Sequence, residues 1–151
     1  ERGALDTLRM AGAAPLLVIN DRWSEDWGER AAQLLLERDE MPDAVYCLND
    51  EIARGMCRTL QMHGHRVPQD IAVIGHDNWD SVCVNVHPTL TSFDNELETM
   101  GRRAARHLLD AINGRPHHGV FQVESRLVIR ESTDATRHDP LHGSGWRAGL
   151  E

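Results

Sequence analysis

Three apolar runs in this sequence end on side chains that can hold a small polar molecule. The first run leads to Trp23, the second to Asn49 and the third to Asp77. An indole offers a flat apolar face, an amide offers both a donor and an acceptor, and a carboxylate offers two acceptor oxygens. Stacking combined with fixed polar partners is typical of sites for sugars and other ring-shaped or polyhydroxylated ligands. We therefore predict a ligand site at these three side chains, with His76 lining it.

Each of these residues also has a structural interpretation. Asn49 or Asp50 is expected to cap the helix that follows. Asp77 suits a turn after Gly75, and Trp23 suits packing at a corner between a strand and a helix. For a single residue these roles are at least as well supported as ligand binding. The convergence of all three on one edge of a sheet is what favours the ligand site.

Motifs for catalysis, cofactors and metals are missing from the sequence. It contains no Gly-x-Ser-x-Gly elbow, no phosphate-binding glycine loop and no His-Glu-x-x-His pattern. The pairs His63-x-His65 and His117-His118 fall in predicted turns, without a cysteine or carboxylate at helical ligand spacing. His76 and Asp77 could exchange a proton, but no nucleophile is evident near them. We expect no enzyme activity, no cofactor and no metal site.

Hydrophobic periodicity predicts the elements that position these residues. Strands are predicted at 15–20, 42–48 and 71–75, and amphipathic helices at 3–12, 25–38 and 50–63. Ser24 is the expected N-cap of the second helix. Amphipathic helices that alternate with continuous apolar strands predict an α/β fold, a Rossmann-like parallel sheet flanked by helices on both faces. Ligands of such sheets bind outside the carboxyl ends of the strands, where the three polar side chains fall.

The pattern changes after residue 75. A long polar loop is predicted over 76–89, followed by a short strand at 90–93. The next helix, over 96–113, carries one apolar stripe, formed by Leu97, Met100, Ala104, Leu108 and Ile112. Residues 120–130 are predicted as one strand, or as two with a break near Ser125. Residues 134–151 lack periodicity, so we expect a flexible tail there.

The composition narrows the class of protein. The 151 residues are 40% hydrophobic and 26% charged, as is typical of soluble globular chains. The net charge of -8 disfavours a nucleic-acid-binding face on this segment. No apolar run has the roughly 20 residues that span a bilayer. Three cysteines without C-x-x-C spacing suit buried thiols in a reducing compartment, so we expect a cytoplasmic protein without a membrane partner.

Several motifs resemble those of LacI/GalR-type transcription regulators. The first is Pro42-Asp-Ala-Val-Tyr-Cys-Leu-Asn-Asp-Glu-Ile-Ala-Arg-Gly55, and the second is Gly64-His-Arg-Val-Pro-Gln-Asp-Ile-Ala-Val-Ile-Gly-His-Asp77. The segments Pro88-Thr-Leu-Thr91, Met100-Gly101 and Leu127-Val-Ile-Arg-Glu-Ser-Thr133 follow in the family's order and spacing. The resemblance covers most of residues 3–133.

The resemblance implies part of a two-lobed sensor, with a periplasmic-binding-protein-like fold of type I. Residues 1–92 correspond to its C-terminal lobe. Residues 93–133 correspond to the crossover strand, helix and closing strands shared with an N-terminal lobe, and 134–151 to the tail. Nothing in the chain matches the helix-turn-helix, the hinge helix or the first half of the N-terminal lobe. The chain is therefore expected to be an incomplete lobe.

The resemblance also assigns roles to residues. In the family, the positions that match Trp23, Asn49 and Asp77 contact a small-molecule effector, here expected to be a sugar or nucleobase-like ligand. His76 stands where the family usually has Tyr or Phe. Members are usually homodimers and bind operator DNA through an N-terminal helix-turn-helix. One dimer contact falls on the loop after the Gly-x-Asp motif, which here contains Trp79, Val82, Cys83 and Val84.

Two other classes of protein stay open at this point. A solute-binding protein of a transport system shares the lobe fold and predicts a secretion signal in the full gene. An α/β enzyme predicts turnover that depends on Asp77 or His76. The leading hypothesis is an effector-sensing and dimerisation segment of a transcription regulator.

Overall fold

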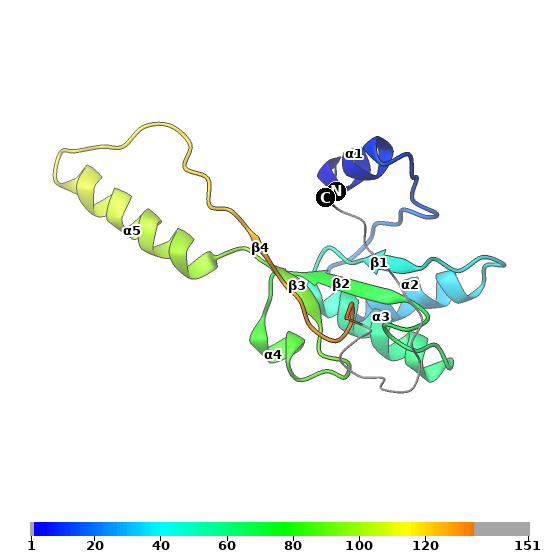
Figure 1. Cartoon of the computed structure of the whole chain (residues 1–151). Coiled ribbons are helices and arrows are strands. Elements are labelled where there is room, and N and C mark those ends of the chain that lie inside the picture. The colour runs from blue at the N-terminus through cyan, green and yellow to red at the C-terminus, as the bar shows by residue number, and fades with distance from the viewer. Residues whose placement is uncertain (1, 135–151) are drawn as a thin grey trace.

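The computed structural model describes residues 2–134 and contains a four-stranded sheet with helices packed on one face (Figure 1). The helices are α1 (Arg2–Met10), α2 (Glu25–Leu36), α3 (Asp50–Met62), α4 (Asp80–Cys83) and α5 (Leu97–Ile112), and the strands are β1 (Ala44–Tyr46), β2 (Ala72–His76), β3 (Thr91–Asp94) and β4 (Arg126–Val128). The predicted α/β fold class is confirmed. The long stretches around α5 project from the sheet as an arm, residues 95–125.

The sheet has the order β1-β2-β3-β4. Strands β1, β2 and β3 are parallel, so their carboxyl ends meet at one edge, while β4 is antiparallel to β3. Asp94, the last residue of β3, therefore lies opposite Arg126, the first residue of β4. The chain leaves the sheet for the arm and returns from it at this same edge, which makes the sheet mixed rather than purely parallel.

Both predicted helix caps are confirmed. The Ser24 hydroxyl oxygen accepts a hydrogen bond from the backbone N–H of Trp27 at 3.3 Å. The side-chain oxygen of Asn49 accepts one from the N–H of Ile52 at 2.7 Å. Each cap satisfies a backbone donor that the first helical turn leaves without a partner. These two residues fix where α2 and α3 begin.

The core lies between the sheet and the helix pair α2 and α3. Its largest fully buried apolar side chains are Leu60, Ile71, Leu90 and Val73. In β2, Val73 and Gly75 are buried while their neighbours are half-buried, so the helices cover one face of this strand more fully than the other. The expectation of full helical cover on both faces is therefore wrong for the described residues, and α1 buries none of its side chains.

Residues 15–20, predicted as a strand, form no strand in the structure. The segment does turn Leu17 and Ile19 toward the core while Val18 stays 47% exposed, which is the alternation of a strand. A strand also needs a partner for its backbone N–H and C=O groups. Because no ladder among residues 2–134 reaches this run, its apolar pattern produces packing without pairing.

Two further predictions need correction. The loop predicted over 76–89 contains the short helix α4, because Val82 and Cys83 are buried on its inner side. The strand predicted over 120–130 shrinks to β4, and Val120 and Phe121 are exposed. No strand precedes Ser125 within this run, so the alternative of two strands with a break near Ser125 is wrong. Nearly all of the predicted tail, residues 135–151, lies outside the described residues. None of the helices within residues 2–134 is long and apolar enough to cross a bilayer.

Candidate functional site

Asp77 lies directly beyond β2, at the edge where the parallel strands end. Its φ of 99° is rare for a residue other than glycine, and Asn78 follows with a φ of 54°. The turn is held by β3, because the N–H of Asp77 donates to the Phe93 carbonyl at 2.9 Å. The carboxylate oxygen Oδ1 of Asp77 accepts from the amide of Asn95 at 3.1 Å. Asp77 is thus a fixed acceptor at the strand ends.

A cluster of rings from three neighbouring strands lies beside Asp77. The Tyr46 hydroxyl lies 2.9 Å from Nδ1 of His76. The Phe93 ring is 6.2 Å from that of Tyr46 and 5.8 Å from that of His76, between centroids. Burial, and secondly the negative charge of Asp77, raise the pKa of Tyr46. The tyrosine therefore stays protonated at neutral pH and can donate a hydrogen bond.

A groove of about 470 Å³ opens at this strand edge, between the turn after β2, the arm and β4. Its lining residues are mostly polar or charged: Asp77, Asn78, Trp79, Asp80, Asp94, Leu97, Glu98, Arg126, Val128 and Arg130. Both signs of charge are present, and Trp79 adds an indole. The groove can offer hydrogen bonds to the hydroxyl and amide groups of a small polar ligand.

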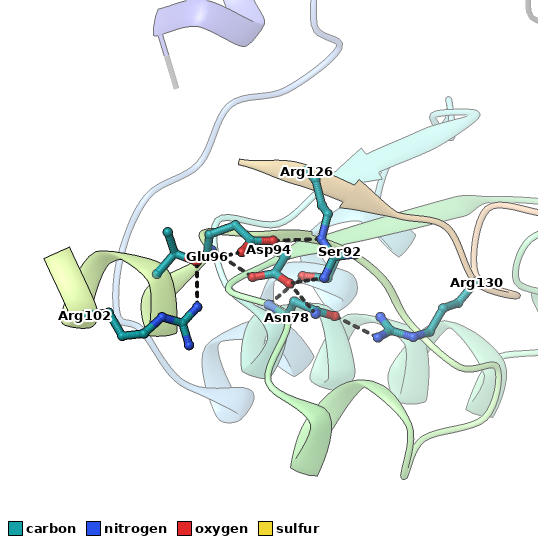
Figure 2. Close-up of polar contacts among 8 residues, drawn as sticks. Asn78, Ser92, Asp94, Glu96, Arg102, Arg126 and Arg130 are labelled. Carbon is teal, nitrogen blue, oxygen red and sulfur yellow. Dashed lines mark hydrogen bonds and ion pairs between the residues drawn. The ribbon is translucent and has the colours of Figure 1, made fainter. Parts of the chain in front are cut away.

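Polar contacts tie the groove wall together, as Figure 2 shows. The Asp94 carboxylate accepts from the backbone N–H of Glu96 at 2.8 Å, from Arg126 at 3.0 Å and from the Asn78 side chain at 3.3 Å. The side-chain oxygen of Asn78 in turn accepts from Arg130 at 2.8 Å. The N–H of Glu96 is the main cause, and the side chains of Arg126 and Asn78 further causes, of the lowered pKa of Asp94. Asp94 is thus the centre of the wall.

A buried carboxylate supports this wall from below. Asp50, the first residue of α3, accepts from the Ser92 hydroxyl at 2.6 Å and from the N–H of Trp79 at 2.9 Å. A Cβ atom on Gly75 would lie 2.4 Å from the same carboxylate, so only glycine leaves room for it. Burial, followed by contact with Asp50, raises the pKa of the Cys83 thiol to about 12. This thiol is therefore protonated and unreactive at neutral pH.

The structure brings only some of the predicted site residues close together. Asp77 lines the groove with His76 beside it in the chain, whereas Asn49 is nearly buried and its oxygen is used by the helix cap. Trp23 is 66% exposed and does not line the groove. It follows the unpaired run 15–20, so no strand carries its indole to the sheet edge. The contribution of Trp23 and Asn49 to a ligand site stays a prediction.

The four residues predicted to make a dimer contact also differ in their exposure. Trp79 is 51% exposed and Val84 is 50% exposed, so both are available to a partner. Val82 and Cys83 are buried inside this chain, which corrects their expected place at a dimer surface. Their side chains anchor α4 to the core instead.

Within residues 2–134, no group of three or more His, Cys, Asp and Glu side chains is placed to hold a metal ion.

Sequence reasoning missed the residues that build the groove wall. They are Ser92, Asp94, Asn95, Arg126 and Arg130. One signal was present: the strand predicted at 90–93 also ends on polar residues, Asp94, Asn95 and Glu96. Applying the rule for strand ends to this fourth run would have found Asp94 and Asn95. Nothing in the sequence indicated that Arg126 and Arg130 return to the same edge.

Comparisons with known proteins agree with this architecture. A family model described as "Periplasmic binding protein-like domain" matches residues 1–133. The regulator CelR of Thermobifida fusca is 38% identical over 117 residues, which are 77% of this chain and 34% of the relative. The repressor PurR of Vibrio atlanticus is 33% identical over 117 residues, 77% of this chain and 35% of the relative. The chain thus spans about a third of the length of these relatives.

Solved structures lead to the same family. The complex of the transcriptional regulator CelR with cellobiose covers 87% of this chain and 41% of its own, with a TM-score of 0.77 and 35% identity. A dimeric Lac repressor covers 87% and 48%, with a TM-score of 0.82 and 26% identity. The relatives named here are all described as regulators or repressors. The chain belongs to the periplasmic binding protein-like domain family, and its resemblance to the effector-binding domain of LacI/GalR-type regulators is confirmed.

Proposed function

We propose that this chain senses a small polar effector as part of a LacI/GalR-type DNA-binding transcription regulator. The observation that carries the proposal is Asp77, an oriented carboxylate that lines a polar groove at the carboxyl ends of the strands. Open α/β sheets bind their ligands at this edge. The second lobe of the full protein closes over this edge and completes the cleft.

The effector is a sugar or a nucleobase-like molecule. Rings and hydrogen-bonding groups lie close together near Asp77, including Tyr46, His76 and Phe93, and such a combination suits a ligand with both a flat face and polar edges. The similar regulator CelR has been solved as a complex with cellobiose, a sugar. Trp23 and Asn49 join the site when the cleft is complete.

The full protein is a cytoplasmic homodimer that binds operator DNA through an N-terminal helix-turn-helix. Trp79 and Val84, both half-exposed, contribute to the dimer contact. A similar structure is a Lac repressor dimer bound to operator, in agreement with this assignment. Residues 1–92 act as the C-terminal lobe and 93–133 as the connection to the other lobe. Effector binding and DNA binding are then coupled through the movement of the two lobes.

The runner-up is a solute-binding protein of a transport system. The matching family description, periplasmic binding protein-like, is what favours it. The coding sequence upstream separates the two proposals, since a regulator requires a helix-turn-helix and a solute-binding protein requires a secretion signal. A secretion signal there would overturn the regulator proposal.

The test of the effector site is Asp77→Ala in the full-length protein, with thermal shift measured against a panel of sugars and nucleobases. A ligand that stabilises the parent should bind the variant at least about tenfold more weakly, because a hydrogen bond to a charged group contributes about 1.5–3 kcal/mol. Asp77→Asn serves as a second variant, since asparagine tolerates the positive φ of this position better than alanine.

Asp39→Ala is the control for the panel. Asp39 is an exposed carboxylate in the turn after α2, away from the groove, so its loss should leave the ligand-induced shift unchanged. If Asp77→Ala and Asp77→Asn fold and still bind like the parent, Asp77 is not an effector contact. If both lose their cooperative unfolding, Asp77 is a structural turn residue instead.

A further inference from the structure

One side-chain amide joins Asp77 to both segments that connect the sheet with the arm. Asn95 directly follows β3, where the chain leaves the sheet, and Ser125 directly precedes β4, where it returns. The amide nitrogen of Asn95 donates to Oδ1 of Asp77 at 3.1 Å. The Ser125 hydroxyl donates to the side-chain oxygen of Asn95, also at 3.1 Å. Asp77, Asn95 and Ser125 thus form a chain of two hydrogen bonds, the 77–95–125 link.

The backbone at the Asp77 end of the link is held by other contacts. Asp77 and Asn78 have positive φ values, a conformation that persists only where its surroundings fix it. Here the N–H of Asn78 donates to the Ser92 hydroxyl at 3.0 Å. The turn is therefore tied to β3, and the Asp77 carboxylate has a set direction toward the Asn95 amide.

Ion pairs hold the two segments together where β3 ends and β4 begins. The Arg126 side chain contacts Asp94 at 3.0 Å and Glu96 at 2.9 Å, so the two residues that flank Asn95 both bind the residue after Ser125 (Figure 2). The Arg126 side chain is 67% exposed, and exposed pairs contribute little stability. The neutral amide of Asn95 adds a contact that reaches beyond the ion pairs to Asp77.

We propose that Asn95 is a positioning residue, which orients the Asp77 carboxylate and connects it to the returning segment through Ser125. The proposal rests on the proposed function, in which Asp77 contacts the effector. An effector that donates a hydrogen bond to Oδ1 shares this acceptor with the Asn95 amide, and so alters the strength and direction of the bond from Asn95. Effector bound at Asp77 then changes how tightly the returning segment is held. In this way effector binding affects the stability of the arm.

Hydrogen exchange of the 151-residue chain, measured by mass spectrometry without ligand, tests the link. Asn95→Asp replaces the donor by a carboxylate next to Asp77, and like charges at this distance repel. We expect exchange to rise by about fivefold at 76–80 and also at 124–128, the factor that corresponds to losing one hydrogen bond of about 1 kcal/mol.

The swapped variant Asp77→Asn/Asn95→Asp carries the same two groups with the donor and the acceptor exchanged. It should return both segments to within about twofold of the parent, because the hydrogen bond forms again in the opposite direction. Such a rescue would show that the two side chains act through the hydrogen bond between them, and not through separate contacts. Asn113→Ala removes another asparagine hydrogen bond, to the Leu109 carbonyl at 2.9 Å, and should leave both segments unchanged.

Ser125→Ala provides the reverse measurement, and also covers the case in which Asn95→Asp does not fold. It should raise exchange at 76–80, although Ser125 reaches Asp77 only through Asn95. A change at 124–128 alone, or a folded swapped variant without rescue, would overturn the proposal. Because no ligand is present, a failed effector screen leaves these results standing, and failure of the link leaves the binding test standing.

Discussion

At the scale of single residues, neighbouring polar side chains with similar chemistry take different roles. Asn49 caps α3, as the sequence predicted for it or for Asp50, and Asp50 is buried under the groove wall. The cap is local, so the sequence predicts it well. The role of Asp50 depends on Ser92 and on the backbone of Trp79, which come close only in the folded chain. No local pattern could have indicated these partners.

Asp50→Ala should lower the free energy of unfolding by about 2–4 kcal/mol, since a buried hydroxyl and a buried N–H lose their acceptor. Asp50→Asn keeps one acceptor oxygen and should lose less. Glu51→Ala, in the same helical turn, should cost less than about 1 kcal/mol through the helix dipole. Urea unfolding followed by circular dichroism measures all three. Equal losses for Asp50→Ala and Glu51→Ala would show that the buried contacts do not stabilise the wall.

At the scale of elements, α2 and α3 approach each other closely through two glycines. A Cβ atom on Gly55 would lie 2.2 Å from the Glu25 carbonyl oxygen, and one on Gly28 would lie 2.1 Å from that of Ile52. The clashing atoms belong to the backbone and cannot move aside without separating the helices. An ion pair between Arg54 and Glu25, at 2.5 Å, connects the same two helices at their surface. The glycines therefore set the distance between them.

Gly55→Ala should destabilise the fold by about 1–3 kcal/mol, the usual cost of inserting a methyl group into a packed contact. Gly101→Ala is the matched control, because Gly101 lies within α5 with open space around its Cα. There the same change should stabilise the helix by about 0.5–1 kcal/mol. Thermal unfolding of both variants checks the contrast in sign. A stabilising Gly55→Ala would contradict the close approach.

The same scale explains which elements could be predicted from the sequence. Helices with a cap and an apolar stripe form from local information, and α2, α3 and α5 were predicted within a few residues of their observed ends. Strands require neighbours, so the apolar run 15–20 remained unpaired and the one at 120–130 shortened to β4. The short helix α4 was missed because two buried residues leave no periodicity to detect.

At the scale of the whole molecule, the sequence predicted where the site lies better than which residues line it. The rule for strand ends located the edge where Asp77 lies, because it depends only on strand direction. It could not bring Trp23 into the groove, since residues before α2 do not join the sheet. Nor could it supply Arg126 and Arg130, which arrive after the arm has left the sheet and returned. Which residues line the site depends on the path that the chain takes through the arm and back to the sheet.

The helix of the arm, α5, carries five exposed large hydrophobic side chains: Leu97, Met100, Leu108, Leu109 and Ile112. None of the residues of α5 is buried, and Leu108 and Ile112 are 63% and 72% exposed. Apolar stripes of this kind drive association. We therefore expect the 151-residue chain to self-associate through α5. Leu108→Glu should weaken the association by about 10–100-fold, since burying a leucine contributes about 1.5–3 kcal/mol.

Arg103→Gln is the control for this experiment, because it lowers the net charge by the same amount and lies on the other side of α5. It should leave the association unchanged. Sedimentation velocity over a range of concentrations measures the mass of each species, and circular dichroism verifies that each variant folds. A parent chain that stays monomeric at every concentration, with α5 formed, would contradict the expectation. Equal weakening by both variants would mean that charge, and not the apolar stripe, controls association.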